Sequence, residues 1–297
     1  MLVKSSLQAS LFAPAALLLL SLGNALDAAA QSTPNEPLHV AIEAFADQQS
    51  VAPGQTFRVA LVERIQPGWH TYWINPGDAG QATKLRWTLP EGYRVADVEW
   101  PVPQVFRSGP LVTYGYEGEA VLLQEVRAPD RLGSAPAQLS VEAQWLACQD
   151  ICIPEHGVAH VTLRQEPLAV RPRPAASPAL FAAAARHLPM PSPWRASLAS
   201  DAASVTLTVH GIARHLPQIA QAQFLPLTWG EIDNAAQQRV VRRGADLLLT
   251  LKRGDLRSSS IATLDGILVL GPGSGELRGQ GYLVHALTSD AGAPLAR

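Results

Sequence analysis

The sequence is poor in charge and in long apolar runs. Only 16% of its 297 residues are charged, and the net charge at pH 7 is −2. This balance gives no electrostatic reason to expect a nucleic acid or an anionic membrane as a partner. After Gln31 the sequence has no apolar run of roughly 18 residues, the length needed to span a bilayer. We therefore expect the mature protein to be soluble and without a membrane span.

Common catalytic motifs are missing as well. The sequence contains no G-x-S-x-G and no H-E-x-x-H pattern, so it lacks the usual signals of a hydrolase or a zinc protease. The stretch GPGSG at residues 271–275 lacks the Gly-Lys-Ser/Thr ending of a phosphate loop, and it predicts a hairpin turn instead. We expect no bound cofactor. Only two cysteines are present, Cys148 and Cys152.

The first thirty residues are typical of an export signal. Lys4 supplies a positive start, and residues 11–22 form an apolar stretch too short to cross a bilayer comfortably. Small residues then precede a cleavage point before Gln31. We predict a signal peptide over residues 1–30, with an uncleaved anchor as the alternative. Export would place the protein in an oxidising compartment, where the cysteine pair can form a disulfide.

The rest of the chain has the pattern of β structure. Its 24 prolines and 22 glycines indicate frequent turns. Between Leu38 and Leu163 short runs alternate apolar and polar residues with a period of two, which is typical of half-buried strands. The clearest runs are residues 57–64, 83–89, 93–100, 119–126, 138–146 and 157–163. Turn signals such as NPGDAG and PEG separate them, so we predict an antiparallel β-sandwich over residues 31–168.

A linker and a second domain follow. Residues 169–193 are rich in proline and alanine. Within them Ser177, at a helix N-cap, and Pro178, at the first helical position, predict one short helix over about 178–188. The alternating pattern then returns at residues 203–211, 245–253 and 266–287. We expect a second, smaller β domain over residues 194–297.

The two cysteines lie in the stretch WLACQDICIPEHG, residues 145–157. A disulfide between them closes a loop of about five residues, worth roughly 2 kcal/mol, against nearly 5 for a loop of about 100 residues. A domain with a large core gains little stability from a disulfide that closes so short a loop. Short loops also favour strained disulfides, which are easily reduced. These arguments favour a redox-active pair, but they leave a structural disulfide and a metal site open.

The setting differs from that of thioredoxin, whose C-x-x-C motif begins a helix that lowers the thiol pKa. Here the spacing is one residue longer, Pro154 follows, and strand patterns flank both sides. Asp150 and Glu155 carry negative charge nearby, which disfavours a thiolate. We expect a pair that reacts slowly with small oxidants and depends on docking with a particular protein thiol. The strand-end position favours Cys148 as the attacking residue.

Metal binding is a further hypothesis for this segment. His156 and His160 continue the four-residue spacing of the cysteines, so all four side chains would line one face of a helix. Pro154 disfavours that helix, and zinc fingers separate their ligand pairs by about a dozen residues. A copper(I) ion held by Cys148 and Cys152 in the reduced state is chemically reasonable, because soft thiolates favour this ion.

Two blocks of the sequence are dense in aromatics, residues 68–80 and residues 111–119. The aromatic residues concerned are Trp69, Tyr72, Trp73, Tyr114 and Tyr116. Their spacing favours a role in the core and corners of the sandwich. The alternative is that some of them line or cover the cysteine pair.

These aromatic blocks, together with KLRWTLPEGY, VEWPVPQVFRSGP and WLACQDICIPE, resemble the N-terminal periplasmic domain of the DsbD family of thiol:disulfide interchange proteins. The likeness is to its ScsB-like branch, which has the C-x-x-x-C spacing and is linked to copper tolerance. It covers about Leu38–Leu163, and FLPLTWGEIDNAAQQ and LDGILVL extend it less specifically to the second domain. The resemblance implies an immunoglobulin-like β-sandwich.

The resemblance also implies roles for single residues. Cys148 and Cys152 correspond to a redox pair that accepts electrons from a thioredoxin-like or membrane donor and reduces periplasmic disulfide-containing proteins. His70 and Tyr72 fall where the family places side chains beside that pair. Phe106 corresponds to the aromatic tip of a cap loop that shields it. We add the two tyrosines of the second aromatic block, Tyr114 and Tyr116, as candidates near the site.

Family members usually continue into a membrane domain and a thioredoxin-like domain, and this sequence shows neither. We therefore expect a separate partner to supply the electrons. The leading hypothesis is a periplasmic thiol–disulfide exchange protein. A copper(I)-binding protein and a non-enzymatic interaction module with an inert disulfide are the alternatives.

Overall fold

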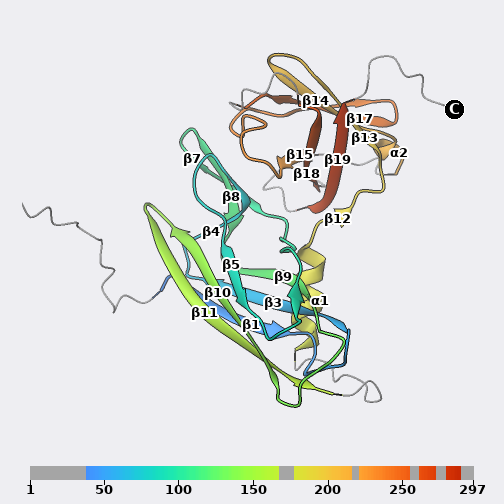
Figure 1. Cartoon of the computed structure of the whole chain (residues 1–297). Helices are drawn as coiled ribbons and strands as arrows, with labels where there is room; N and C mark the ends of the chain where they lie inside the picture. Colours follow the sequence, from blue (N-terminus) through green and yellow to red (C-terminus); the bar gives the residue numbers. More distant parts are fainter. Residues whose placement is uncertain (1–37, 167–176, 216–220, 255–260, 272–278, 289–297) are drawn as a thin grey trace, which may run out of the picture. The chain divides into compact units, whose positions relative to one another are not determined.

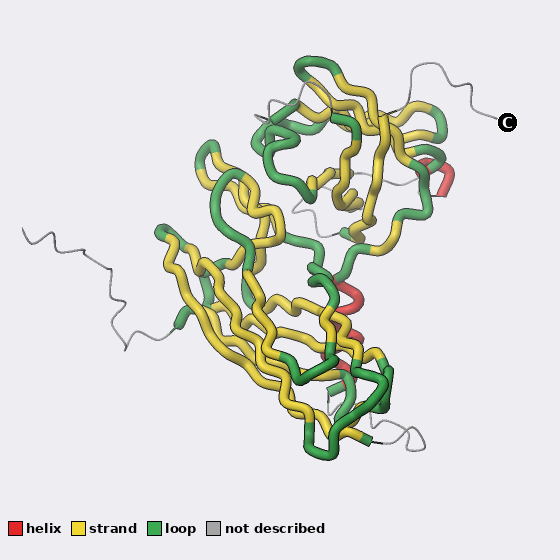
Figure 2. Tube along the Cα trace, viewed as in Figure 1, coloured by secondary structure: helices red, strands yellow, loops and turns green. Residues whose placement is uncertain are grey.

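The computed structural model describes residues 38–166, 177–215, 221–254, 261–271 and 279–288. β-strands dominate this part of the chain, and Figure 2 shows its helical turns in red. The all-β prediction is therefore confirmed. No helix within these ranges is long and apolar enough to cross a membrane. The predicted signal peptide, residues 1–30, lies outside the described residues.

Two four-stranded sheets form the first domain (Figure 1). One sheet has the order β1 (Val40–Ala46), β3 (Thr56–Ile65), β9 (Glu119–Arg127) and β6 (Arg94–Val95). The other has the order β2 (Ser50–Val51), β11 (Cys152–Gln165), β10 (Ala137–Cys148) and β5 (Lys84–Thr88). The short β2–β11 pair is parallel and the others are antiparallel. The immunoglobulin-like sandwich is confirmed.

The core between the sheets follows the period-two pattern of the sequence. Phe57 and Val59 of β3 lie on one face of the strand and are almost fully buried. They pack with Val126 of β9 and, across the sandwich, with Leu139 of β10. Burying a large apolar side chain contributes about 1.5–3 kcal/mol, so this layer holds the two sheets together.

One predicted strand is largely wrong. Residues 93–100 alternate like a strand, but only Arg94–Val95 forms one, followed by an isolated bridge between Glu99 and Leu123. Val95 pairs with Val126 of β9. The four residue steps from Val95 to Glu99 therefore lie opposite only three steps of β9, from Val126 to Leu123. One extra residue thus interrupts the pairing, as in a β-bulge. The alternating pattern gives no warning of such an insertion.

A small sheet of β4 (Thr71–Gly77), β8 (Leu111–Tyr116) and β7 (Gln104–Ser108) carries the two aromatic blocks. The rings of Trp73 and Tyr114 meet edge to face, with centroids 6.1 Å apart, and both residues are fully buried. They belong to the same core cluster as Leu61 of β3 and Trp145 of β10. Much of the aromatic content of these two blocks therefore packs in the core, as its spacing predicted.

The predicted linker helix is confirmed as α1 (Pro178–His187), with Ser177 at the N-cap position and proline at the first helical position. The Ser177 side chain makes no capping hydrogen bond. On the helix, Ala184 packs against Ala60 of β3 and Leu123 of β9. The helix therefore covers the face of the first sheet that points away from the sandwich core.

The second β region consists of one sheet of eight strands. Its order is β15 (Gln221–Pro226), β18 (Thr263–Gly271), β19 (Gln280–Thr288), β13 (Ala196–Ser200), β14 (Ser204–Val209), β17 (Asp246–Lys252) and β16 (Arg239–Arg243), with β12 (Met190–Pro191) on β19. The short helix α2 (Ile212–His215) follows β14. The predicted runs correspond to β14, β17 and the antiparallel β18–β19 pair. The predicted turn at residues 271–275 lies outside the described residues after Gly271.

A half-buried carboxyl group in this region predicts pH-dependent stability. Burial, together with the charge of Asp265, raises the pKa of Glu231 to about 7 from the ordinary 4.5. Because the folded-state pKa lies above the unfolded one, stability falls as the pH rises from about 4.5 through 7. Allowing for solvent screening, we expect Glu231→Gln to raise the free energy of unfolding by about 1–2 kcal/mol at pH 8. The gain should nearly vanish at pH 4. Urea denaturation at both pH values measures this, and an equal effect at both would contradict it.

Candidate active site at the Cys148–Cys152 disulfide

The disulfide closes the end of the longest hairpin of the sandwich, which Figure 1 shows as β10 and β11 side by side. Cys148 is the last residue of β10, Cys152 is the first of β11, and the two are register partners. Directly opposite residues of antiparallel strands point to the same side of the sheet. Their sulfur atoms are bonded at 2.02 Å. The setting between two strands is the one that the sequence predicted.

The two cysteines differ in their access to solvent. Cys148 is 1% exposed, whereas Cys152 is exposed to solvent. The His70 N–H donates to the Cys148 carbonyl at 2.8 Å, and the Cys148 N–H donates to the His70 carbonyl at 3.0 Å. This backbone pair brings the start of β4 against the cysteine end of β10. Of the two cysteines, Cys152 is therefore the one on the surface.

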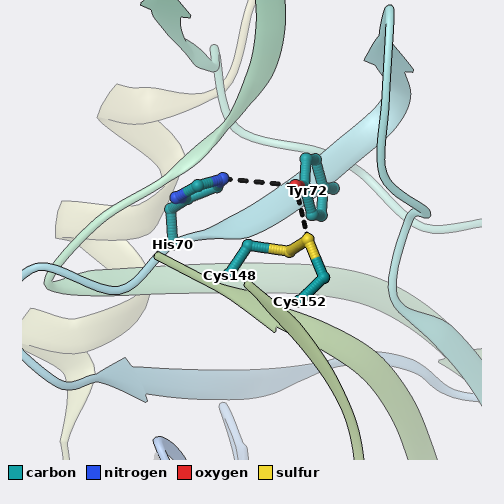
Figure 3. The surroundings of a disulfide bond; sticks show 4 residues. All are labelled: His70, Tyr72, Cys148 and Cys152. Atoms are coloured by element: carbon teal, nitrogen blue, oxygen red, sulfur yellow. Dashed lines mark hydrogen bonds between the residues drawn. A yellow bond between two sulfur atoms is a disulfide. The ribbon is translucent and has the colours of Figure 1, made fainter. Parts of the chain in front are cut away.

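The hydroxyl of Tyr72, on β4, bridges His70 and the sulfur of Cys152 (Figure 3). The hydroxyl oxygen is 3.5 Å from Cys152 Sγ and 3.3 Å from His70 Nε2. Burial lowers the pKa of His70 and raises the pKa of Tyr72, so both groups are neutral at pH 7. The hydroxyl has one proton and donates it to either neighbour. Once the disulfide is reduced, donation to Cys152 would favour the thiolate.

Phe106 of β7 completes this group of aromatic side chains. Its ring stacks on the His70 imidazole, with centroids 4.9 Å apart and an interplanar angle of 22°. The structure thus brings together three of the five predicted neighbours of the cysteine pair: His70, Tyr72 and Phe106.

The other two predicted neighbours, Tyr114 and Tyr116, are buried in the core. The Tyr114 hydroxyl donates to Asn234 Oδ1 at 3.1 Å, and the Tyr116 hydroxyl donates to the Pro101 carbonyl at 2.8 Å. Their hydrogen bonds therefore run to the second β region and to the segment before β7. A role for them at the disulfide stays a prediction.

Two features of the site escaped the sequence analysis. Gly80 has a φ of +102°, and a Cβ at this position would overlap the Tyr72 ring, so only glycine allows the ring its place. The sequence marked NPGDAG simply as a turn. In addition, the imidazole of His39 stacks on Trp69, the residue before His70, with centroids 3.6 Å apart. No local sequence pattern predicts a contact between two residues so far apart in the chain.

The charged and histidine residues near the pair are placed as follows. Glu155 is buried, and the alternation along β11 puts it on the face opposite to Cys152. Asp150 is exposed in the turn, and His156 and His160 are exposed on β11. Within the described ranges, no three His, Cys, Asp or Glu side chains are grouped to hold a metal ion.

Residues 40–162, which include the disulfide, match the family model described as "Thiol:disulfide interchange protein DsbD, N-terminal". This match confirms, for this part of the chain, the resemblance to the N-terminal domain of the DsbD family.

Solved structures extend the likeness of the fold. The N-terminal periplasmic domain of ScsB from Proteus mirabilis matches with a TM-score of 0.56 and 20% identity, over 82% of this chain and 91% of that one. This identity shows the fold alone. The C-terminal domain of the AgI/II polypeptide BspA from Streptococcus agalactiae has a TM-score of 0.23 and 8% identity, over 84% of this chain and 100% of that one, which is too distant for any argument. A search of curated proteins gave no match.

Proposed function

We propose that this protein exchanges its Cys148–Cys152 disulfide with thiols of partner proteins in the periplasm and so relays reducing equivalents. The observation that carries the proposal is the asymmetry of the pair: Cys152 is an exposed residue, whereas Cys148 beside it is buried. The Tyr72 hydroxyl lies 3.5 Å from Cys152 Sγ. The match of residues 40–162 to a thiol:disulfide interchange family supports it.

Each exchange moves two electrons and two protons. A partner thiolate attacks Cys152 Sγ, the Cys148–Cys152 bond breaks, and Cys148 leaves as a thiolate that takes up a proton. A second partner thiolate then attacks the partner sulfur of this mixed disulfide and releases the Cys152 thiolate, which takes up the other proton. The partner dithiol is oxidised and the cysteine pair is reduced. The reverse sequence reduces a disulfide in an acceptor protein.

The exposures favour Cys152 as the attacking thiol of the reduced protein, rather than Cys148, which its place at the strand end had favoured. The reason lies in the pairing of His70 with Cys148, which covers that side of the hairpin. Strand position alone does not reveal which of two register partners a neighbouring segment covers.

Trapping tests the proposal directly. In a Cys148→Ser variant Cys152 cannot be released by its neighbour, so a mixed disulfide formed with a partner persists. We expect a periplasmic extract to yield covalent complexes with Cys148→Ser, identified by mass spectrometry, and far fewer with Cys152→Ser. If neither variant forms such complexes, and the reduced wild-type protein binds one copper(I) ion tightly, the copper-binding alternative replaces exchange.

The stacked Phe106 predicts a measurable shielding of the disulfide. Phe106→Ala removes the ring that stacks on His70, the residue whose backbone pairs with Cys148. We expect dithiothreitol to reduce the variant several-fold faster, on the order of 3- to 10-fold, because disulfide exchange depends on access to sulfur. Phe57→Leu, a change in the core between the sheets, serves as the control. An unchanged rate in Phe106→Ala would show that this ring does not limit access.

A further inference from the structure

A buried carboxyl group lies next to the strand that carries Tyr72. Glu63 is 1% exposed and lies on the same face of β3 as Phe57, Val59 and Leu61. A carboxyl group on a core-facing strand position costs stability even when it is hydrogen-bonded, and burial raises the pKa of Glu63. An apolar side chain would suit the packing better. The presence of Glu63 at this position is therefore best explained by the side chains to which it is hydrogen-bonded.

The Glu63 side chain joins two segments of the site. Its Oε2 accepts a hydrogen bond from Thr71 Oγ1 at 2.8 Å, and its Oε1 accepts one from Thr83 Oγ1 at 2.7 Å. Both threonines are buried. The two carboxyl oxygens thus connect β3 to β4 and to the segment that precedes β5.

Both segments determine where the Tyr72 ring lies. Thr71 directly precedes Tyr72 on β4, so fixing Thr71 fixes the backbone from which the ring projects. Thr83 follows Gly80 by three residues, and Gly80 lies against the face of that ring. The ring in turn places its hydroxyl 3.5 Å from Cys152 Sγ. The chain of contacts therefore runs from Glu63 through the two threonines and Tyr72 to the sulfur of Cys152.

We propose that Glu63 is a positioning residue that, through Thr71 and Thr83, holds Tyr72 over the disulfide and thereby controls how readily the sulfur of Cys152 is attacked. The proposal deepens the proposed exchange function and rests on it for its biological meaning. The proposal itself makes a statement only about how fast the disulfide reacts with thiols.

The test is a double-mutant cycle on the rate at which dithiothreitol reduces the full-length protein. Thr83→Val keeps the side-chain volume and removes one hydroxyl bond to Glu63. We expect the rate constant to rise roughly threefold or more in this variant, and the rise to disappear in a Tyr72→Ala background, because residues in one network do not act additively. Tyr72→Leu replaces Tyr72→Ala in the cycle if the alanine variant does not fold.

Two further variants separate positioning from a general loss of stability. Glu63→Gln keeps the shape and can bond both threonines, so its rate should stay close to that of the wild type, whereas Glu63→Leu should react faster. Leu139→Ala, in the core between the sheets, lowers stability without touching this network and should leave the rate unchanged. Equal acceleration of Thr83→Val in both Tyr72 backgrounds, or no acceleration at all, would overturn the proposal. Failure to trap partner proteins would instead overturn the exchange function and leave this result intact.

Discussion

In single-cysteine variants, the thiol of Cys152 should react with iodoacetamide at least about 100-fold faster than the thiol of Cys148, because a buried thiol reacts only after local opening of the structure. The variants are Cys148→Ser and Cys152→Ser. The expectation follows from burial, because Cys148 is 1% exposed whereas Cys152 is exposed to solvent. Local opening that costs roughly 3 kcal/mol slows a reaction by about this factor.

The alkylation experiment has an internal control. In concentrated guanidinium chloride both thiols are equally accessible, so the two variants should react at nearly the same rate. The folded rates are compared at one pH after correction for the thiol pKa, obtained from the pH dependence of alkylation. Equal corrected rates in the folded state would contradict the asymmetry on which the exchange proposal is based.

Removal of the Glu155 carboxyl group should have the largest effect on stability. Its Oε1 accepts from His39 N at 2.8 Å and is 2.6 Å from His39 Nδ1. Its Oε2 accepts from Val40 N at 3.2 Å and from Trp145 Nε1 at 3.0 Å. Glu155→Ala leaves several of these donors without an acceptor in a buried place. We expect a loss of about 3–5 kcal/mol in the free energy of unfolding.

Urea denaturation followed by tryptophan fluorescence measures this loss. Glu91→Ala removes an exposed carboxyl group and should change stability by less than about 0.5 kcal/mol. A loss below about 1 kcal/mol in Glu155→Ala would mean that water replaces the carboxylate at the indole and backbone N–H groups. The segment at His39 and Val40 would then be held to the sandwich more weakly than these hydrogen bonds indicate.

Much of the fold could be predicted from local patterns. Alternation predicted β3, β9, β10 and β17 to within a few residues, because each has at least one face that packs in a core and a period of two reports that face directly. The bulge after β6 could not be predicted, since an inserted residue leaves the alternation unchanged. The pattern on β3 also continued through Glu63, where a carboxyl group occupies an apolar position.

The candidate site could be predicted only in part. The cysteine pair, Pro154 and the flanking strand patterns are local features of the sequence. The structure places the pair between two strands, as these features predicted. Tyr72 contacts a sulfur atom 80 positions away in the chain, and only the family resemblance led to it. Tyr114 was included because it lies in an aromatic block, yet its hydroxyl bonds Asn234, 120 positions away. Periodicity describes the face on which a side chain lies but not its partner on a distant strand.

The central claim is that the Cys148–Cys152 disulfide is exchangeable. Its reduction potential tests this most directly, measured by equilibrating the protein with glutathione or dithiothreitol buffers and alkylating the free thiols. A small disulfide loop with one exposed cysteine predicts a potential above about −300 mV, within the range of disulfides that protein thiols reduce. A potential below about −300 mV would identify a structural disulfide and contradict the relay function.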